Sequence, residues 1–335
     1  METVTDLRLD VVAPDDAGAV REYVEVHRAV RLVDSPWQHP LTEHQAVGQL
    51  RHGWDGEPSV GYVGRVAGRP VAVASYGTSE YDNRHLAWTD VRVHPDLRRR
   101  GLGSAVLAGL RERARAEGRT SLGTDGWESA AAVAFAARHG LAQRAVDVNR
   151  RQHLAELDRD ALDTAYAGAL PHATAYELVR MPGRSSDEEL PALAVMTAAI
   201  NDAPTDDLDL EDEVFPPERV RAYEEAQLQR GHRLHRVVAR HRASGELAGQ
   251  TVVTVDGERP TLAEQHDTSV VAAHRGHRLG LLLKLEMLRW LAETQPQVAT
   301  IDTWNSESNG PMIAVNELLG YRVLGRVLVF QGPVS

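Results

Sequence analysis

Apolar and polar positions alternate along the whole chain with two different periods. Short stretches with period two, such as residues 60–66 and 70–79 on either side of a glycine, predict paired strands joined by a turn. Stretches with apolar positions three and four apart, such as residues 17–33, predict helices, and Asp15 or Asp16 can cap this one. The chain therefore reads as a succession of short strands and amphipathic helices.

The two halves of the chain give the same order of elements: strand, helix, helix, three strands, helix, strand, helix and a closing strand. In the first half the ranges are 7–12, 17–33, 42–53, 60–66, 70–79, 85–93, a helix ending near 118, 120–124, 130–139 and 144–154. In the second half they include 176–180, 187–200, 217–230, 235–240, 250–256, 281–294, 300–304, 311–319 and 321–330. A connecting helix over 158–170 separates them. This order predicts an α/β fold with a mixed, mostly antiparallel sheet flanked by helices in each half.

One stretch occurs twice. Residues 90–103 read DVRVHPDLRRRGLG, and residues 267–280 read DTSVVAAHRGHRLG, 177 positions later. A repeat with so long a period indicates two tandem copies of one domain rather than a solenoid. We expect an N-terminal domain over 1–157, a linker over 158–174 and a C-terminal domain over 175–335.

Each repeated stretch passes from a strand through a basic, glycine-containing turn into a helix. The glycines at 101 and 103 lack a Cβ, so the backbone can turn sharply and approach a ligand closely. The helix that follows begins with unpaired N–H groups and a positive dipole end, which together receive phosphate. In the second copy Arg278 replaces the first of these glycines, which makes binding by that loop less secure.

The pattern Arg-x-x-Gly-x-Gly, directly after a strand that ends Val-x-Val-His-Pro, resembles the acetyl-CoA signature of the GNAT superfamily of N-acetyltransferases. The other common phosphate-loop patterns, GxxxxGK[ST] and GxGxxG, are absent from the sequence. The order of elements is also similar to the GNAT fold, in a layout like that of two-domain actinobacterial members. The resemblance implies transfer of an acetyl group from acetyl-CoA to a primary amine of a small molecule, by direct attack of the amine on the thioester.

In the family the loop N–H groups hold the pyrophosphate, and a bulge in the preceding strand opens the sheet for the pantetheine arm. A strand residue before the last helix also contacts that arm. Carried over, the cosubstrate contacts are Val91, Arg92, Val93, Arg98, Arg99, Arg100, Gly101, Leu102, Gly103 and Ser104 in the first copy, and Val270, Arg275, Gly276, His277, Arg278, Gly280 and Asn309 in the second. Asn309 can equally be a plain helix N-cap.

An alkylamine is mostly protonated at neutral pH, so the reaction needs a proton acceptor. Asp90 and Asp267 stand at equivalent places just before the expected bulge, and each is either this base or a structural carboxylate that pairs with an arginine. Family members often carry a tyrosine, as the acid for the departing thiolate, four residues before the glycine that ends the last helix. Ala136 and Asn316 occupy those positions here, so the sequence names no acid.

Residues 201–213 hold seven acidic and no basic side chains. In this fold the segment borders the acceptor cleft, where it would attract a cationic amine such as a polyamine, an aminoglycoside or a basic peptide. The alternative is a solvated loop without a binding role.

Composition narrows the class of protein. A formal net charge of −11 argues against nucleic acid as the main partner, and the absence of cysteine excludes disulfides and zinc–thiolate sites. There is no tight His/Asp cluster and no apolar run of membrane-spanning length, so we expect no metal, no membrane partner and a cytoplasmic monomer or homodimer. The alternative to an enzyme is a non-catalytic acyl-CoA-binding or scaffold protein in which one or both halves are degenerate.

Overall fold

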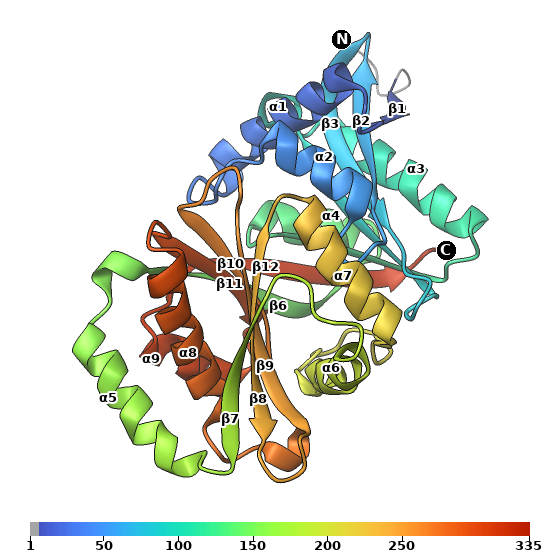
Figure 1. Cartoon of the computed structure of the whole chain (residues 1–335). Coiled ribbons are helices and arrows are strands. Elements are labelled where there is room, and N and C mark those ends of the chain that lie inside the picture. The colour runs from blue at the N-terminus through green and yellow to red at the C-terminus, as the bar shows by residue number, and fades with distance from the viewer. Residues whose placement is uncertain (1–6) are drawn as a thin grey trace. The chain divides into compact units, whose positions relative to one another are not determined.

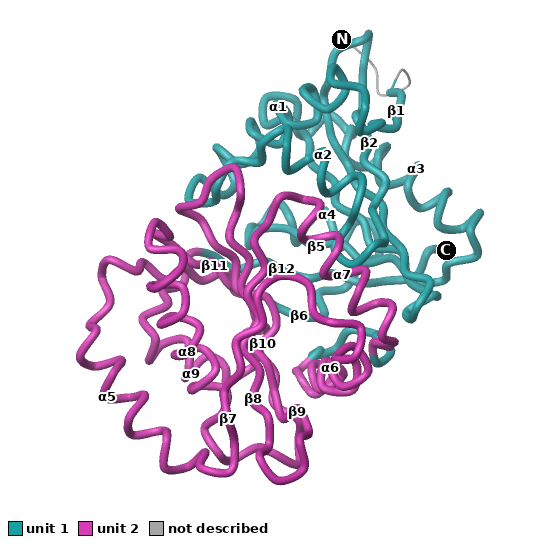
Figure 2. Tube along the Cα trace, viewed as in Figure 1, with its two compact units in different colours: residues 1–147, 205–212, 325–335 teal, residues 148–204, 213–324 magenta. Residues whose placement is uncertain are grey.

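The computed structural model describes residues 7–335, which form two compact units (Figures 1 and 2). Unit 1, teal in Figure 2, runs to Asp147 and also contains Thr205–Asp212 and Gly325–Ser335. Unit 2, in magenta, contains Val148–Pro204 and Glu213–Leu324. Each unit is thus assembled from segments that are distant in the sequence.

Unit 1 is an α/β unit with a mixed, mostly antiparallel sheet. Its strands follow the order β1-β2-β3-β4-β5-β12, in which only the β4–β5 pair is parallel. Its elements are β1 Arg8–Val11, α1 Ala17–Asp34, α2 Glu43–His52, β2 Val60–Val66, β3 Arg69–Gly77, β4 Leu86–Val93, α3 Leu102–Ala116, β5 Ser121–Trp127, α4 Ala130–Arg138 and the larger part of β12 Arg322–Pro333.

Helices cover both faces of the unit 1 sheet because its strands alternate. On β3, Ala72 and Ala74 pack in the core beneath α3, while Val73 between them packs with α1 and α2. Leu107 and Leu110 of α3 are about 1% exposed, and burial of each such side chain contributes roughly 1.5–3 kcal/mol. Asp16 caps α1 by accepting hydrogen bonds of 3.0 Å from two backbone N–H groups, which confirms one of the two predicted caps.

Unit 2 repeats this architecture. The strand order is β6-β11-β10-β9-β8-β7, and the β10–β11 pair is parallel whereas β10–β9, β9–β8 and β8–β7 are antiparallel. Its elements are the end of β6 Ala142–His153, α5 Arg159–Ala169, β7 Tyr176–Pro182, α6 Leu190–Thr197, α7 Pro217–Gln229, β8 Arg233–His241, β9 Leu247–Val255, β10 Leu262–Val270, α8 Leu279–Thr294, β11 Thr300–Ser306 and α9 Gly310–Leu318. One core lies under α8 and a second under α6 and α7.

The closing strands are exchanged between the two halves of the sequence. Strand β12, from the end of the chain, pairs with β5 from Val327–Trp127 to Pro333–Ser121 and completes the sheet of unit 1. The end of β6 lies in unit 2, where Arg151 makes a bidentate ion pair of 2.6 and 2.7 Å with Asp302 of β11. The expectation that each half closes its own sheet is wrong, because strand alternation does not specify the pairing partner. The limits at 157 and 175 stay a prediction about the repeat in the sequence.

Candidate acetyl-CoA and acceptor sites

The two glycine loops have the same backbone conformation, although their glycines stand at different positions. In the first loop Arg99 (φ 63°) and Gly101 (φ 84°) are left-handed, and in the second Gly276 (φ 85°) and Arg278 (φ 56°) are. Each loop therefore contains one glycine and one arginine in the left-handed region, where a side chain is strained. Arg278 does not alter the turn that Gly101 makes in the first copy.

Each loop leads into a helix whose first N–H groups have no intrahelical acceptor. The first backbone bond of α3 runs from Ala105 N–H to Gly101 O at 3.0 Å, and that of α8 from Leu282 N–H to Arg278 O at 3.1 Å. Within residues 7–335, no side chain caps either helix start. Three N–H groups and the positive dipole end are thus directed out of each helix, as a phosphate site requires.

The first arginine of each motif holds the loop in place. Arg98 donates to the last carbonyl of β4 at 3.2 Å and forms a bidentate ion pair with Asp34, at 2.8 and 2.6 Å. Arg275 donates to the last carbonyl of β10 at 3.0 Å and pairs with Asp202. Both guanidinium groups are thus occupied by the protein, and their predicted contact with the cosubstrate stays a prediction.

The other loop side chains divide into two groups. Arg99, Arg100, His277 and Arg278 are exposed at the turns, and their contact with the cosubstrate stays a prediction. Leu102 and Ser104 point inward: Leu102 is 6% exposed, and Ser104 Oγ lies 2.8 Å from His139 Nε2. A Cβ on Gly103 would lie 3.2 Å from Phe135, and one on Gly280 would lie 4.0 Å from Val270, so these two glycines allow close packing of the helix on its sheet.

In both units the parallel strand pair separates halfway along its length. Strands β4 and β5 pair from their starts up to Thr89 and Thr124, and β10 and β11 up to Gln265 and Thr303. All four strands continue for two or more residues beyond these points. Beyond these points the two strands of each pair are no longer paired with each other, and the GNAT resemblance assigns the pantetheine arm to such a separation.

The expected bulge is present only in unit 2. The register of β10 against β9 shifts between Gln265 and Thr268, so two residues of β10 oppose one residue of β9. Strand β4 pairs with β3 without a shift from Trp88 to Val93. The expectation of a bulge in the first copy is therefore wrong, since β4 has no extra residue at this point.

Asp90 and Arg92 lie on the face of β4 that α1 and α2 cover. Arg92 Nε donates to Asp90 Oδ2 at 2.6 Å. The intervening Val91 and the following Val93 pack on the opposite face, against the α3 core. The Arg92 side chain is thus occupied by an ion pair on the face opposite the α3 core, and the structural reading of Asp90, a carboxylate held by arginine, describes its contacts.

Asp125 of β5 is a functional candidate that the sequence interpretation missed. Desolvation by the surrounding protein and then the charge of Asp90 raise the pKa of Asp125 to about 7, against the opposing effect of Arg92. The side chain remains accessible to solvent. A carboxyl group that titrates near neutral pH beside an open strand edge can accept a proton from a substrate.

Two more carboxyl groups, those of Asp147 and Asp206, contribute to the negative charge around Asp125. Burial and then the charge of Asp206 raise the pKa of Asp147. Asp206 lies in Thr205–Asp212, which unit 1 anchors through Asp209 N–H to Gln331 Oε1 at 2.7 Å. Long-range hydrogen bonds thus place these residues in unit 1, although they follow the first helix of the second copy, and the prediction that the acidic segment borders the acceptor cleft stays a prediction.

Helix α1 contributes a neutral imidazole to the same face. Burial, and then the positive charge of Arg92, lower the pKa of His27 to about 3. Its ring lies 4.5 Å from that of Tyr23, and burial together with the Asp90 charge raises the pKa of Tyr23. Neither residue carries a charge at neutral pH, so Arg92 is the cation of this cluster.

In unit 2, Asp267 lies in the bulge and lacks the arginine that holds Asp90. Ser269 stands where the first copy has Arg92, and no side chain in the described part of the chain bonds or pairs with the Asp267 carboxylate. Burial raises the pKa of Asp267, while the charges of His266 and Arg236 oppose the rise. The role of Asp267 as the base stays a prediction.

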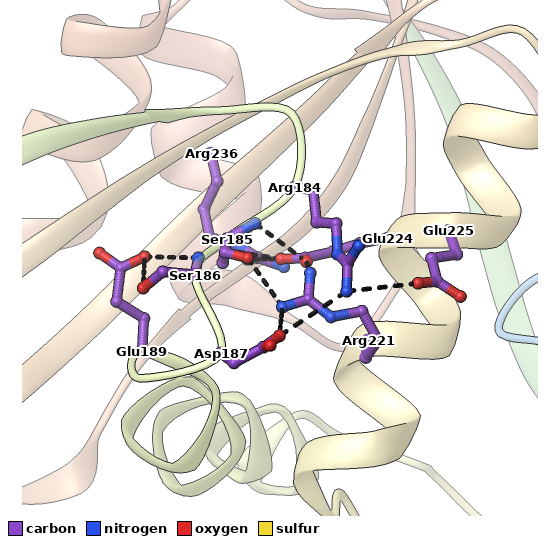
Figure 3. A network of polar contacts seen from close by, with 9 residues as sticks. All are labelled: Arg184, Ser185, Ser186, Asp187, Glu189, Arg221, Glu224, Glu225 and Arg236. Carbon is purple, nitrogen blue, oxygen red and sulfur yellow. Dashed lines mark hydrogen bonds and ion pairs between the residues drawn. The ribbon is translucent and has the colours of Figure 1, made fainter.

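A buried polar network explains why Arg236 does not pair with Asp267 (Figure 3). Glu224 of α7 is fully buried and pairs with Arg236 and, at 2.8 Å, with Arg221. It also accepts from Ser185 N–H at 3.1 Å and Ser185 Oγ at 2.6 Å. The network fastens α7 and the loop before α6 to β8, and it uses the Arg236 charge for that purpose.

His266, the other bulge residue, lies within hydrogen-bonding distance of Tyr223 and Thr254. Tyr223 Oη is 2.6 Å from His266 Nδ1, and Thr254 Oγ1 is 3.2 Å from Nε2. Burial and then the charge of Asp267 raise the pKa of Tyr223 well above its ordinary value, so its hydroxyl stays protonated. The sequence interpretation did not single out either residue, because α7 and β10 are far apart in the chain.

Both residues that stand at the usual tyrosine positions, Ala136 and Asn316, are buried. Ala136 packs in the unit 1 core, whereas Asn316 accepts a hydrogen bond of 2.7 Å from Lys284. Asn309 caps α9 by accepting from Met312 N–H at 3.3 Å, which confirms its reading as an N-cap. Its contact with the pantetheine arm stays a prediction.

No helix within residues 7–335 is both long and apolar enough to cross a membrane, and no group of three or more His, Asp or Glu side chains among these residues is arranged to hold a metal ion.

Known proteins match both the sequence and the fold. Residues 26–141 match the acetyltransferase (GNAT) family. A mycothiol acetyltransferase of Stackebrandtia nassauensis is 30% identical over 158 residues, which are 46% of this chain and 49% of that protein. The chain thus spans about half the length of this curated relative.

Two solved structures cover nearly the whole chain. A tandem GNAT protein from the clavulanic acid biosynthesis pathway is 28% identical with a TM-score of 0.78, over 98% of this chain and 99% of that one. A GCN5-related N-acetyltransferase from Sphaerobacter thermophilus shares the fold with a TM-score of 0.67 at 14% identity, over 98% and 96% of the two chains. Residues 26–141 thus match the GNAT family model, and the chain as a whole is similar in fold to a tandem GNAT protein.

Proposed function

We propose that the protein is an N-acetyltransferase that moves the acetyl group of acetyl-CoA to a primary amine of a small, cationic molecule. The observation that carries this proposal is a combination found in both units. A helix start with free N–H groups follows directly on a strand that has separated from its parallel neighbour, and a carboxylate lies beside the separation. These parts are suited to hold a diphosphate, admit an extended thioester and accept a proton.

The reaction follows from these parts. A neutral amine attacks the thioester carbonyl carbon, a C–N bond forms, and the C–S bond breaks with its electron pair on sulfur. The amine proton goes to a carboxylate, for which Asp267 in unit 2 and Asp125 in unit 1 are suited by their raised pKa values. Held at the opening, the two substrates react as if in one molecule, and this proximity supplies much of the acceleration.

The cationic character of the acceptor is proposed from unit 1. Four aspartates of unit 1 interact through their charges, and Arg92 is the cation among them. These aspartates are Asp90, Asp125, Asp147 and Asp206. Such a field attracts a molecule with two or more amino groups, one to react and the others to bind.

The test is thiol release from acetyl-CoA across a panel of polyamines, aminoglycosides, basic peptides and neutral amines. We expect Asp147→Asn with Asp206→Asn to raise the KM of cationic acceptors about tenfold, equivalent to about 1.4 kcal/mol, and to weaken its salt dependence. Glu25→Gln, at an exposed position of α1, is the matched control. An unchanged KM and salt dependence in the double variant would exclude the cationic acceptor.

The alternative function is acyl-CoA binding without transfer. Buried Ala136 and Asn316 at the usual tyrosine positions favour it. Saturable acetyl-CoA binding without thiol release for any amine in the panel would establish it.

A further inference from the structure

Lys284 of α8 is a charged side chain inside the apolar core of unit 2. It is 3% exposed and surrounded by buried leucines of the same helix. Its Nζ donates to Asn316 Oδ1 at 2.7 Å and lies 4.7 Å from the centre of the Tyr321 ring. No carboxylate pairs with it within residues 7–335. An ammonium in such a place is costly to bury, and burial lowers the pKa of Lys284 to about 7.

The first copy shows that the fold does not require this lysine. In the register that matches Arg98 to Arg275, Lys284 corresponds to Leu107, which is about 1% exposed in the unit 1 core. Asn316 stands four residues before Gly320, as Ala136 stands four residues before Gly140, so these two residues correspond by their distance from the glycine that ends the last helix. Unit 1 therefore has an apolar pair where unit 2 has a hydrogen-bonded polar pair, so both members of the pair differ together.

Lys284 is the first donor in a series of hydrogen bonds that leads to the point where β10 and β11 separate. Asn316 Nδ2 donates to Asn305 Oδ1 at 3.2 Å, and Arg150 Nη1 donates to the same oxygen at 2.9 Å. Lysine has no acceptor, so Lys284 forces the Asn316 oxygen toward itself and the amide nitrogen toward Asn305. With its oxygen taken by two donors, Asn305 in turn presents its NH₂ group, of which one hydrogen goes to Ser306 O at 2.9 Å.

This series of hydrogen bonds ends on the strand next to the one that carries the candidate base. Strands β10 and β11 last pair at Gln265 and Thr303, and Asp267 and Asn305 each stand two residues beyond that point, one on either strand. A proton acceptor thus lies on one strand of the opening and an amide donor on the other. When the thioester breaks, negative charge passes to sulfur, and preorganised donors stabilise such charge more than water does.

We infer that Lys284 is a positioning residue, which orients and polarises the Asn316–Asn305 amide chain so that Asn305 donates to the sulfur leaving coenzyme A in unit 2. This inference rests on the proposed function. The amine proton goes to Asp267, the C–S electron pair stays on sulfur, and the thiolate then takes a proton from water.

The test uses coenzyme A bound to the full chain, and the ultraviolet absorbance of its thiolate reports the thiol pKa. We expect the bound thiol of the wild type to ionise about one pH unit or more below that of Lys284→Met, as thiols beside cationic groups do. Lys284→Gln, which keeps a donor without the charge, should fall between the two. Leu107→Met, at the equivalent position of unit 1, should match the wild type.

The folding control is urea denaturation, in which Lys284→Met should remain folded, because the loss of a buried amine offsets the loss of its hydrogen bond to Asn316. If coenzyme A does not bind, the proposed function fails and the inference fails with it. If coenzyme A binds and its thiol titrates identically in the wild type and in folded Lys284→Met, the inference alone is wrong.

Discussion

Equivalent aspartates have different surroundings in the two copies because the residues next to them differ. Asp90 and Asp267 occupy equivalent positions, but Arg92 holds the first at 2.6 Å while Ser269 leaves the second unpaired. Asp125, next to the occupied Asp90, has its pKa raised to about 7 by burial and by that neighbour's charge. The surroundings therefore favour a base on β10 in unit 2 and on β5 in unit 1.

The pH dependence of kcat identifies the half that performs the chemistry. A carboxyl base works only when ionised, so kcat rises with pH through its raised pKa, near pH 7 for Asp125. In the active half, Asp125→Asn or Asp267→Asn should lower kcat by roughly 10²–10⁴-fold and remove this rise. Rates of thiol release, measured from pH 5 to pH 9 in a stopped or a continuous assay, give this pH dependence of kcat.

The controls are Glu25→Gln in unit 1 and Glu188→Gln in unit 2, which change exposed carboxylates remote from both openings in sequence. If Asp125→Asn and Asp267→Asn both keep the wild-type pH profile, neither carboxylate is the base.

The sequence could identify Asp267 but not Asp125, and the reason is physical. Asp267 follows from its place in the repeat, a local property. The raised pKa of Asp125 comes from desolvation and from the charge of Asp90 on the neighbouring strand, which sequence spacing does not report. Lys284 and Asn316 are 32 positions apart and form their hydrogen bond only when α8 and α9 pack together, so sequence spacing does not report this contact either.

At the scale of elements, the two loops reach one conformation with different residues. Gly101 and Arg278 precede the helices in equivalent left-handed positions, and so do Arg99 and Gly276 two residues earlier. The strand, turn and helix that form the candidate phosphate site could therefore be predicted from the sequence. The bulge could not, because only the pairing of β10 with β9 decides where the extra residue lies.

Arg278→Gly tests how the second loop balances strain against charge. Glycine removes a left-handed arginine, so the free energy of unfolding should rise by about 1 kcal/mol. Acetyl-CoA affinity should fall, because an exposed cation beside the helix start is lost. Urea denaturation and calorimetric titration measure the two effects.

Gly101→Ala is the matched change in the first loop, and its unfolding free energy should fall by about 1 kcal/mol. A loss of stability in Arg278→Gly would contradict the strain that its φ of 56° indicates.

At the scale of the whole molecule, the exchange of closing strands makes each unit depend on both halves of the sequence. Strand β12 covers the edge of β5, and the end of β6 borders β11. An uncovered edge of this length would invite aggregation. Element order and fold class could be predicted from alternation and from the repeat, but this exchange could not, because both closing strands have the same pattern.

The most direct test of the central claim, that the helix starts at α3 and α8 are diphosphate sites, is calorimetric titration with acetyl-CoA. Arg100→Glu and His277→Glu place a carboxylate at equivalent exposed positions of the two loops. We predict saturable binding by the wild type, a loss of at least about tenfold in affinity at whichever loop is changed, and no binding by the double variant. Undiminished binding by the double variant, or no binding by the wild type, would contradict the account.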